Sequence, residues 1–308
     1  MRSLVFAYHD VGYVCLQELL RTGDPVVAVV THDDDPHETI WFRSVRELAA
    51  AHGLPVYAPE TVNTPEWIER LSAYKPDVLF SFYYRKMLRK EVLALPARGA
   101  LNLHGSLLPK YRGRSPVNWV LIHDERETGV TLHYMDEKPD HGDIVAQRAV
   151  PITDDDTALT LFHKLTAAAA ALMREVYPLL RAGRAPRRPQ THTAASYFGG
   201  RRPDDGRIDW SLPARAIFNL VRAVTHPYPG AFSAWQARRL YVWQARPLPG
   251  RHVTGAAPGT IVSVAPRLEI QAGSDALQLL GVQVDGENEV SGSTWAARHG
   301  VREGDRLT

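Results

Sequence analysis

An amide and an imidazole stand two residues apart in this sequence, at Asn102 and His104. Because successive side chains of a strand point to opposite faces, a strand over residues 100–104 would project both groups from one face. Gly105 would let the chain turn at the carboxyl end of that strand, where open α/β sheets bind ligands. An amide can donate to an oxyanion and an imidazole can accept a proton from an attacking amine, which points to acyl transfer. The alternative is a hydrogen-bonded pair without chemistry.

A carboxylate that could act on this imidazole follows at Asp140. Residues 129–134 and 144–147 are predicted strands, with Asp140 in the loop between them. There it would orient His104 and favour its charged form, although Asp and Gly in such a loop also simply make turns. A metal site is the weaker alternative, because the spacing of the ligand-type residues matches no metal signature. These residues are His133, Asp136, Asp140, His141 and Asp143.

Three basic residues, Lys110, Arg112 and Arg114, lie in the segment that follows the predicted catalytic strand. Together with neighbouring prolines and Gly113, they could hold an anionic group near the strand ends. A solvated loop is the alternative interpretation.

The elements that must position these residues form an alternating pattern. Short apolar runs at residues 4–7, 26–30 and 78–82 are typical of parallel strands buried on both faces. Helices are predicted between them, at residues 11–21, 44–52 and 65–74. This alternation indicates a doubly wound α/β sheet. The turn after the first run has one glycine, Gly12, and lacks the G-x-G-x-x-G fingerprint of a dinucleotide site.

The pattern changes in the second half of the chain. A long helix is predicted over residues 154–181, followed by a proline-rich basic segment. After a predicted helix at residues 214–224 come short strands separated by turn residues, at residues 240–243, 259–264 and 276–280. We therefore expect a catalytic domain over residues 1–189, a linker over residues 190–203, and a smaller, mainly β, barrel-like domain over residues 204–308.

Composition limits the partners. The chain has 308 residues, with 36 basic and 34 acidic side chains and a formal net charge of +2, which gives no general attraction to nucleic acid or membranes. The single cysteine, Cys15, excludes an internal disulfide framework and suits a reducing compartment. The apolar run near the N-terminus is too short for a signal peptide. We therefore expect a cytoplasmic protein without membrane or nucleic-acid partners.

Three separated elements resemble the folate-dependent formyltransferase family: Asn102-x-His104, the run Ser-Leu-Leu-Pro-Lys-Tyr-Arg-Gly at residues 106–113, and Asp140-x-Gly142. The similarity extends over nearly the whole chain, through residues 6–10, 80–85, 201–205 and 227–232. It implies a 10-formyltetrahydrofolate-dependent N-formyltransferase. The implied fold is a Rossmann-like doubly wound parallel sheet with a smaller, OB-like C-terminal β-barrel domain.

The resemblance also implies roles for residues of the site. His104 would accept and then donate a proton, Asn102 would stabilise the tetrahedral intermediate, and Asp140 would favour the charged form of His104. No metal is required. The co-substrate 10-formyltetrahydrofolate would contact Lys86, Met87, Leu88, Arg114, Asp136, Glu137, Lys138, Pro139 and Asp140.

The acceptor implied by the resemblance is a UDP-linked amino sugar. The chain is most similar to formyltransferases that act on UDP-4-amino-4-deoxy-L-arabinose in lipid A modification and polymyxin resistance. In bifunctional members the transferase is fused to a UDP-glucuronate decarboxylase, so fusion or association with one is expected. Whether this chain acts alone or is one domain of a longer protein stays open, and so does its oligomeric state.

Other acceptors are alternatives to the UDP-linked amino sugar. Relatives formylate other nucleotide-linked amino sugars or methionyl-tRNA. The acidic segment at residues 32–38 would repel a nucleic-acid backbone, which disfavours tRNA. Two further alternatives are an enzyme that hydrolyses the formyl donor to formate and a binding module that catalyses no reaction.

Overall fold

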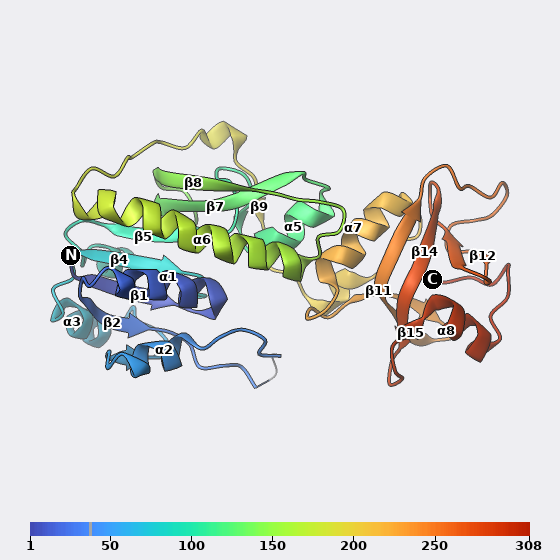
Figure 1. The fold of residues 1–308 in the computed structure, drawn as a ribbon, viewed down its shortest axis with the longest axis horizontal. Helices are drawn as coiled ribbons and strands as arrows, with labels where there is room; N and C mark the ends of the chain where they lie inside the picture. Colours follow the sequence, from blue (N-terminus) through green and yellow to red (C-terminus); the bar gives the residue numbers. More distant parts are fainter. Residues whose placement is uncertain (37–38) are drawn as a thin grey trace. The chain divides into compact units, whose positions relative to one another are not determined.

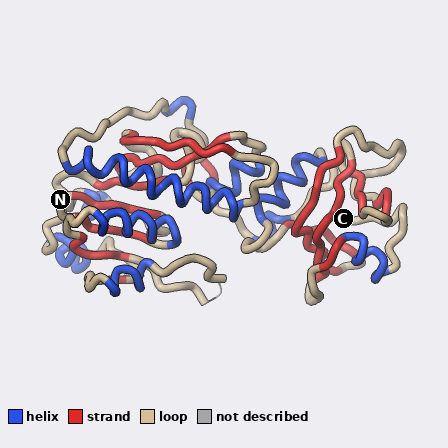
Figure 2. Tube along the Cα trace, viewed as in Figure 1, coloured by secondary structure: helices blue, strands red, loops and turns tan. Residues whose placement is uncertain are grey.

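The computed structural model describes residues 1–36 and 39–308, which form two compact units (Figures 1 and 2). Unit 1 consists of Met1–Pro116, Glu127–Pro151 and Phe162–Gly199. Unit 2 consists of Val117–Arg126, Ile152–Leu161 and Gly200–Thr308. Segments from different parts of the sequence thus combine in each unit.

Unit 1 is built on a seven-stranded sheet in the order β3-β2-β1-β4-β5-β7-β8. Strands β1 to β5 run parallel, and β7 and β8 add an antiparallel edge. The apolar runs of the sequence form its centre, and every residue of β1 and β4 is buried. The predicted α/β fold class is therefore confirmed, with a mixed edge. The strands are β1 (Ser3–Ala7), β2 (Val26–Val30), β3 (Val56–Tyr57), β4 (Val78–Phe82), β5 (Ala100–His104), β7 (Glu127–Tyr134) and β8 (Ile144–Pro151).

Three helices of unit 1, α1, α2 and α3, begin within two residues of their predicted starts. Ser44 caps α2 by accepting the N–H of Glu47 at 3.2 Å, and Thr64 caps α3 by accepting the N–H of Trp67 at 3.4 Å. Helix α1 packs on β1 and β4. The helices are α1 (His9–Arg21), α2 (Val45–Ala51), α3 (Pro65–Ser72) and α4 (Lys90–Leu93).

The long helix α6 (Ala158–Arg181) begins four residues later than the predicted start at residue 154. The Asp156 carboxylate accepts the N–H of Thr153 at 2.8 Å and the hydroxyl of Thr160 at 3.0 Å. The first bond closes a turn between Thr153 and Asp156, and the second joins Asp156 to the first turn of α6. A short acidic side chain that accepts from a nearby backbone N–H offers the chain an alternative to helix, so α6 starts after this turn.

Residues 190–199 lie in unit 1, where β9 (Tyr197–Phe198) pairs in parallel with β6 (Arg112–Gly113). A short 3₁₀ helix, His192–Ala194, precedes β9. This segment therefore runs alongside the sequence block that follows β5.

Unit 2 contains an antiparallel sheet in the order β10-β11-β14-β13-β12, with β15 paired to β14. Helix α7 occupies the predicted range and packs mainly on β11. The predicted mainly β character of the C-terminal part is thus confirmed. The elements are α5 (Pro116–Ile122), a 3₁₀ helix (Pro203–Gly206), α7 (Ala214–Val224), β10 (Ala231–Trp235), β11 (Arg238–Leu248), β12 (Ile261–Ser263), β13 (Leu268–Gln271), β14 (Ala276–Val284), β15 (Val290–Ser291) and α8 (Gly292–His299).

No helix in the described part of the chain combines the length and apolarity that crossing a bilayer demands.

Candidate active site

The strand that carries Asn102 and His104 is β5, which lies between parallel β4 and antiparallel β7. The β5–β7 register places His133 directly opposite Asn102. Because directly paired residues of neighbouring strands project their side chains from the same face, the amide of Asn102 and the ring of His133 are neighbours. His104, two residues further along β5, shares that face.

Three side chains converge on one carboxylate oxygen of Asp140. Its Oδ1 lies 3.3 Å from Nδ2 of Asn102, 3.5 Å from Nδ1 of His104 and 3.5 Å from Nε2 of His133. Its Oδ2 accepts the backbone N–H of Gly113 at 2.8 Å. The structure thus brings Asn102, His104 and Asp140 together, and it adds a second imidazole that the sequence analysis did not place there.

One ring nitrogen of His104 is hydrogen-bonded to the backbone. Its Nε2 lies 2.7 Å from the carbonyl oxygen of Tyr111, and a carbonyl oxygen only accepts, so Nε2 carries a proton. The nitrogen left to exchange a proton is Nδ1, which faces Asp140 across 3.5 Å. That separation is longer than a hydrogen bond, so the contact is mainly electrostatic.

The Asp140 carboxylate is charged although the structure encloses it. Burial raises its pKa, but the nearby rings of His104 and His133 and the N–H of Gly113 outweigh burial. Together they hold the pKa of Asp140 well below its usual range. A fixed negative charge therefore stands beside the proton-exchanging nitrogen of His104.

Asp140→Asn is expected to destabilise the fold more at neutral pH than in acid. A carboxyl group whose pKa is lowered by folding adds stability above its unfolded pKa of about 4. That stability is lost as the pH falls toward the folded pKa. Urea unfolding of wild type and variant at several pH values measures this, and the difference in unfolding free energy should shrink below about pH 4. Asp155→Asn, at an exposed carboxylate, is the control. A difference that grows in acid would contradict the assignment.

The loop that carries Asp140 is held by close backbone packing. A Cβ atom on Gly142 would lie 2.1 Å from the carbonyl oxygen of Tyr134, so only glycine fits there. The backbone of Asp140 itself has a φ of 52°, in the left-handed region. Gln190 donates to the carbonyl oxygens of Asp140 and Gly142 at 3.0 and 2.7 Å.

Gly142→Ala should therefore lower both stability and kcat. The added methyl group must displace backbone, at a cost of about 1–3 kcal/mol, and the shift moves Asp140 away from Asn102. Thermal unfolding and steady-state kinetics measure the two effects. Gly199→Ala is the matched control, because a Cβ there meets no atom within 4 Å. Equal effects of the two substitutions would argue against the close packing.

Arg112 is not available to an anion, which corrects the expectation for the basic segment. Its side chain is 1% exposed, and its guanidinium donates to Gln190 Oε1 and to the hydroxyl of Tyr197. It therefore ties residues 190–198 to the catalytic block. Lys110 and Arg114 are exposed.

The predicted folate contacts other than Arg114 lie in two loops of unit 1. Because β4 and β5 are parallel neighbours, the loop after β4 leaves the sheet at the same edge as Gly105. In that loop Met87 is 58% exposed, the Lys86 ammonium donates to the carbonyl oxygens of Pro59 and Glu60, and the Leu88 side chain is buried in the core. The second loop has four exposed residues, Asp136, Glu137, Lys138 and Pro139, and is joined to the cluster through Asp140.

The position of His133 beside Asn102 was not predicted from the sequence, where this residue was a candidate metal ligand only. Within residues 1–36 and 39–308 no group of three or more such side chains gathers as a metal site would require. Strand alternation could have shown that His133 faces one side of β7. The register with β5 is a long-range pairing that the local pattern does not contain.

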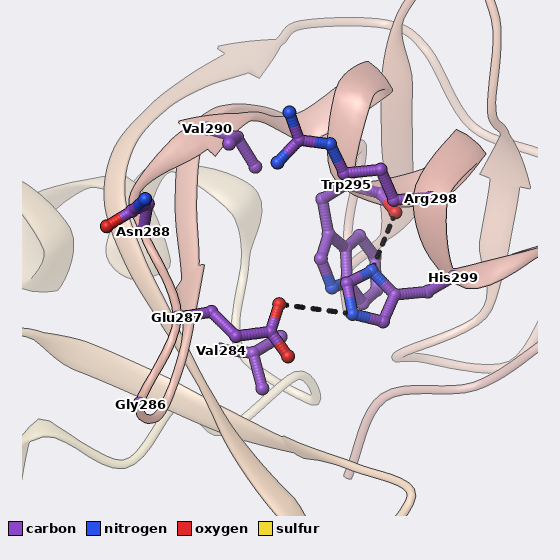
Figure 3. A pocket seen from close by; sticks show the side chains of 8 residues that line it. All are labelled: Val284, Gly286, Glu287, Asn288, Val290, Trp295, Arg298 and His299. Atoms are coloured by element: carbon purple, nitrogen blue, oxygen red, sulfur yellow. Dashed lines mark hydrogen bonds and ion pairs between the residues drawn. The ribbon is translucent and has the colours of Figure 1, made fainter.

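A separate cavity of about 320 Å³ lies in unit 2, beside α8 and β14 (Figure 3). Glu287 and His299 face one another across it at 3.3 Å, and Glu287 is also paired with Arg238 at 2.7 Å. The cavity contains none of the predicted site residues.

Comparison with known proteins identifies the family of the chain. Residues 4–177 match the formyl transferase family and residues 201–300 match the formyl transferase C-terminal domain. The N-formyltransferase from Helicobacter canadensis, in complex with folinic acid and dTDP-3-aminofucose, has a similar fold, with a TM-score of 0.68 and 19% identity over 90% of this chain and 98% of that one. WlaRD, a sugar 3N-formyl transferase with dTDP and 5-N-formyl-THF, has a TM-score of 0.67 and 18% identity over 94% and 99%.

HypX from Aquifex aeolicus, in complex with tetrahydrofolic acid, has a TM-score of 0.64 and 19% identity over 100% of this chain and 50% of that one. This chain therefore spans about half the length of HypX. At such identities the three structures show the fold, and the match over residues 4–177 covers more than half of the sequence. The chain accordingly belongs to the formyl transferase family.

Proposed function

We propose that this chain transfers the formyl group of 10-formyltetrahydrofolate to the primary amine of a nucleotide-linked amino sugar, with UDP-4-amino-4-deoxy-L-arabinose as the acceptor. The observation that carries the proposal is the convergence of Asn102 and His104 on Oδ1 of Asp140 at the carboxyl end of β5. Folinic acid and tetrahydrofolic acid are bound in proteins of the same fold, which supports the folate donor.

The cluster supplies the groups that formyl transfer to an amine needs. The neutral amine forms a bond to the formyl carbon, and the carbonyl π electrons move onto the oxygen. The amide of Asn102 donates to that oxyanion, and Nδ1 of His104 takes the proton that the amine loses. The intermediate then collapses, the bond to the folate nitrogen breaks, and His104 returns the proton to that nitrogen. Asp140 stabilises the imidazolium between these two transfers.

We assign this chemistry to residues 1–189 and the donor site to the two loops that leave the sheet near β5. Exposed backbone and side chains after β4, at Lys86 and Met87, and the loop residues 136–140 would contact the folate. Leu88 would contribute through its backbone, since its side chain is 3% exposed. Arg114 is exposed, and its backbone N–H donates to the carbonyl oxygen of Phe198, which fixes the chain at this residue. Its guanidinium would meet a carboxylate of the donor.

A nucleotide sugar fits the charges better than tRNA does. Residues 33–35 are three consecutive aspartates, and a segment that contacts a nucleic-acid backbone needs lysine and arginine instead. Arg46 pairs with Asp33, and Asp34 accepts the hydroxyl of Tyr8 at 2.9 Å, so two of these acids are held by unit 1 itself. His37 and Glu38, also counted in the acidic segment, lie outside the described residues. Proteins of the same fold have been determined with dTDP or dTDP-3-aminofucose.

A panel of acceptors tests the proposal. With 10-formyltetrahydrofolate as donor, kcat/KM is measured for UDP-4-amino-4-deoxy-L-arabinose, for dTDP-linked amino sugars and for methionyl-tRNA. We expect the UDP sugar to have the highest value. Preference for a dTDP sugar would contradict the UDP sugar as acceptor but keep a nucleotide-linked amino sugar. Exclusive use of methionyl-tRNA would contradict a nucleotide-linked amino sugar altogether.

A further inference from the structure

The side chain of His133 is enclosed in the strand that faces the catalytic amide. It is 2% exposed and pairs in register with Asn102 across β5 and β7. Its Nε2 lies 3.2 Å from Nδ2 of Asn102, and its Nδ1 lies 2.8 Å from the carbonyl oxygen of Tyr134. Both ring nitrogens therefore have a partner.

These partners fix which nitrogen carries the proton. The Tyr134 carbonyl only accepts, so Nδ1 of His133 carries a proton, and Nε2 is an acceptor whenever the ring is neutral. An amide nitrogen only donates, which agrees with Nδ2 of Asn102 facing Nε2. The opposite orientation of the amide would put its oxygen 3.3 Å from the Asp140 carboxylate oxygen with no hydrogen between them. His133 and Asp140 together therefore hold the NH₂ side of Asn102 toward themselves.

The same distances show that one amide hydrogen is enough for both contacts. The contacts of 3.2 and 3.3 Å from Nδ2, with 3.5 Å between the two acceptors, form a nearly equilateral triangle. The acceptors thus subtend about 60° at Nδ2, whereas the two N–H bonds of an amide diverge by about 120°. A single N–H directed between the two acceptors can therefore serve both, which leaves the second N–H for another acceptor.

We propose that His133 is a positioning residue, which orients Asn102 so that its second N–H is free for the oxyanion of the formyl-transfer intermediate. This inference rests on the proposed function, because it assigns a use to the free N–H. His133 itself contacts no reacting atom. Without its acceptor nitrogen, Asn102 loses one of the two partners that fix the plane and the orientation of its amide.

His133→Met and His133→Gln form a matched pair, because the two side chains have similar size and only glutamine offers a good acceptor near the position of Nε2. We expect His133→Met to lower kcat by about 5- to 30-fold, the effect of a lost side-chain hydrogen bond in an enclosed site. KM for donor and acceptor should change little, and His133→Gln should recover most of kcat. Thr128→Val is the control on the same strand, since its buried hydroxyl has no hydrogen-bond partner in the described structure.

A double-mutant cycle with Asn102→Ala separates positioning from packing. If His133 acts through Asn102, adding His133→Met to Asn102→Ala should lower kcat no further. An additive loss would overturn the proposal, as would equal losses in His133→Met and His133→Gln. Wild-type kcat in a folded His133→Met enzyme, checked by thermal unfolding, would overturn it too. If wild type transfers no formyl group to any amine, the proposed function fails instead, so the two failures are distinct.

Discussion

His104→Gln is expected to lower kcat for formyl transfer by about 100- to 10,000-fold, the usual contribution of a positioned general acid–base group. The glutamine amide can still donate to the Tyr111 carbonyl, which now accepts from Nε2 at 2.7 Å. It has no group that exchanges a proton at the position of Nδ1, 3.5 Å from Asp140. The substitution therefore removes the proton transfer and leaves the local backbone contact in place. Steady-state kinetics with saturating donor and acceptor measures the loss.

His52→Gln provides the control for this substitution. His52 is exposed at the end of α2, and the hydrogen bond of its ring in the described structure is to the carbonyl oxygen of Leu48. Its replacement should leave kcat unchanged. A His104→Gln enzyme with near-normal kcat would show that the proton is carried by another group.

Asn102→Ala should lower kcat by about 100- to 1,000-fold, as removal of an oxyanion donor does in other acyl-transfer enzymes. The amide makes no backbone contact that the structure requires, because its bonds go to His133 and Asp140. The fold should therefore survive, and binding of the folate donor, measured by fluorescence titration, should change little. The loss should appear in kcat, because the oxyanion exists only after attack.

A near-normal kcat for purified Asn102→Ala protein would reject the oxyanion role. A raised KM with unchanged kcat would instead place Asn102 in substrate binding. The two outcomes are separated by measuring both constants over a range of donor and acceptor concentrations.

Local patterns in the sequence predicted the parts of the site that depend on a single element. Asn102 and His104 share a face because they are two residues apart on one strand, and Gly105 follows its carboxyl end. Asp140 was predicted in a loop between two strands, and the structure places it there, against the same cluster. The starts of α2 and α3, predicted at residues 44 and 65, likewise depend on short-range residue types.

Long-range contacts determine the positions of His133 and Arg112, which the local sequence pattern did not predict. His133 meets Asn102 through the pairing of β5 with β7, across 31 positions of sequence. Arg112 is enclosed because Gln190 reaches it from 78 positions away. Neither contact has a local signature, since both depend on register and on the path of residues 190–198. The later start of α6 has a local cause, the bonds of Asp156, which competes with helix propensity.

The fate of a labelled formyl group tests the central claim most directly. Wild-type protein is incubated with 10-formyltetrahydrofolate carrying a ¹³C-formyl group and with UDP-4-amino-4-deoxy-L-arabinose, and the products are followed by NMR. The label should appear in an amide on the sugar nitrogen, and this signal should nearly vanish with His104→Gln. Label recovered as free formate, with no amide formed by wild type, would contradict the account and indicate hydrolysis.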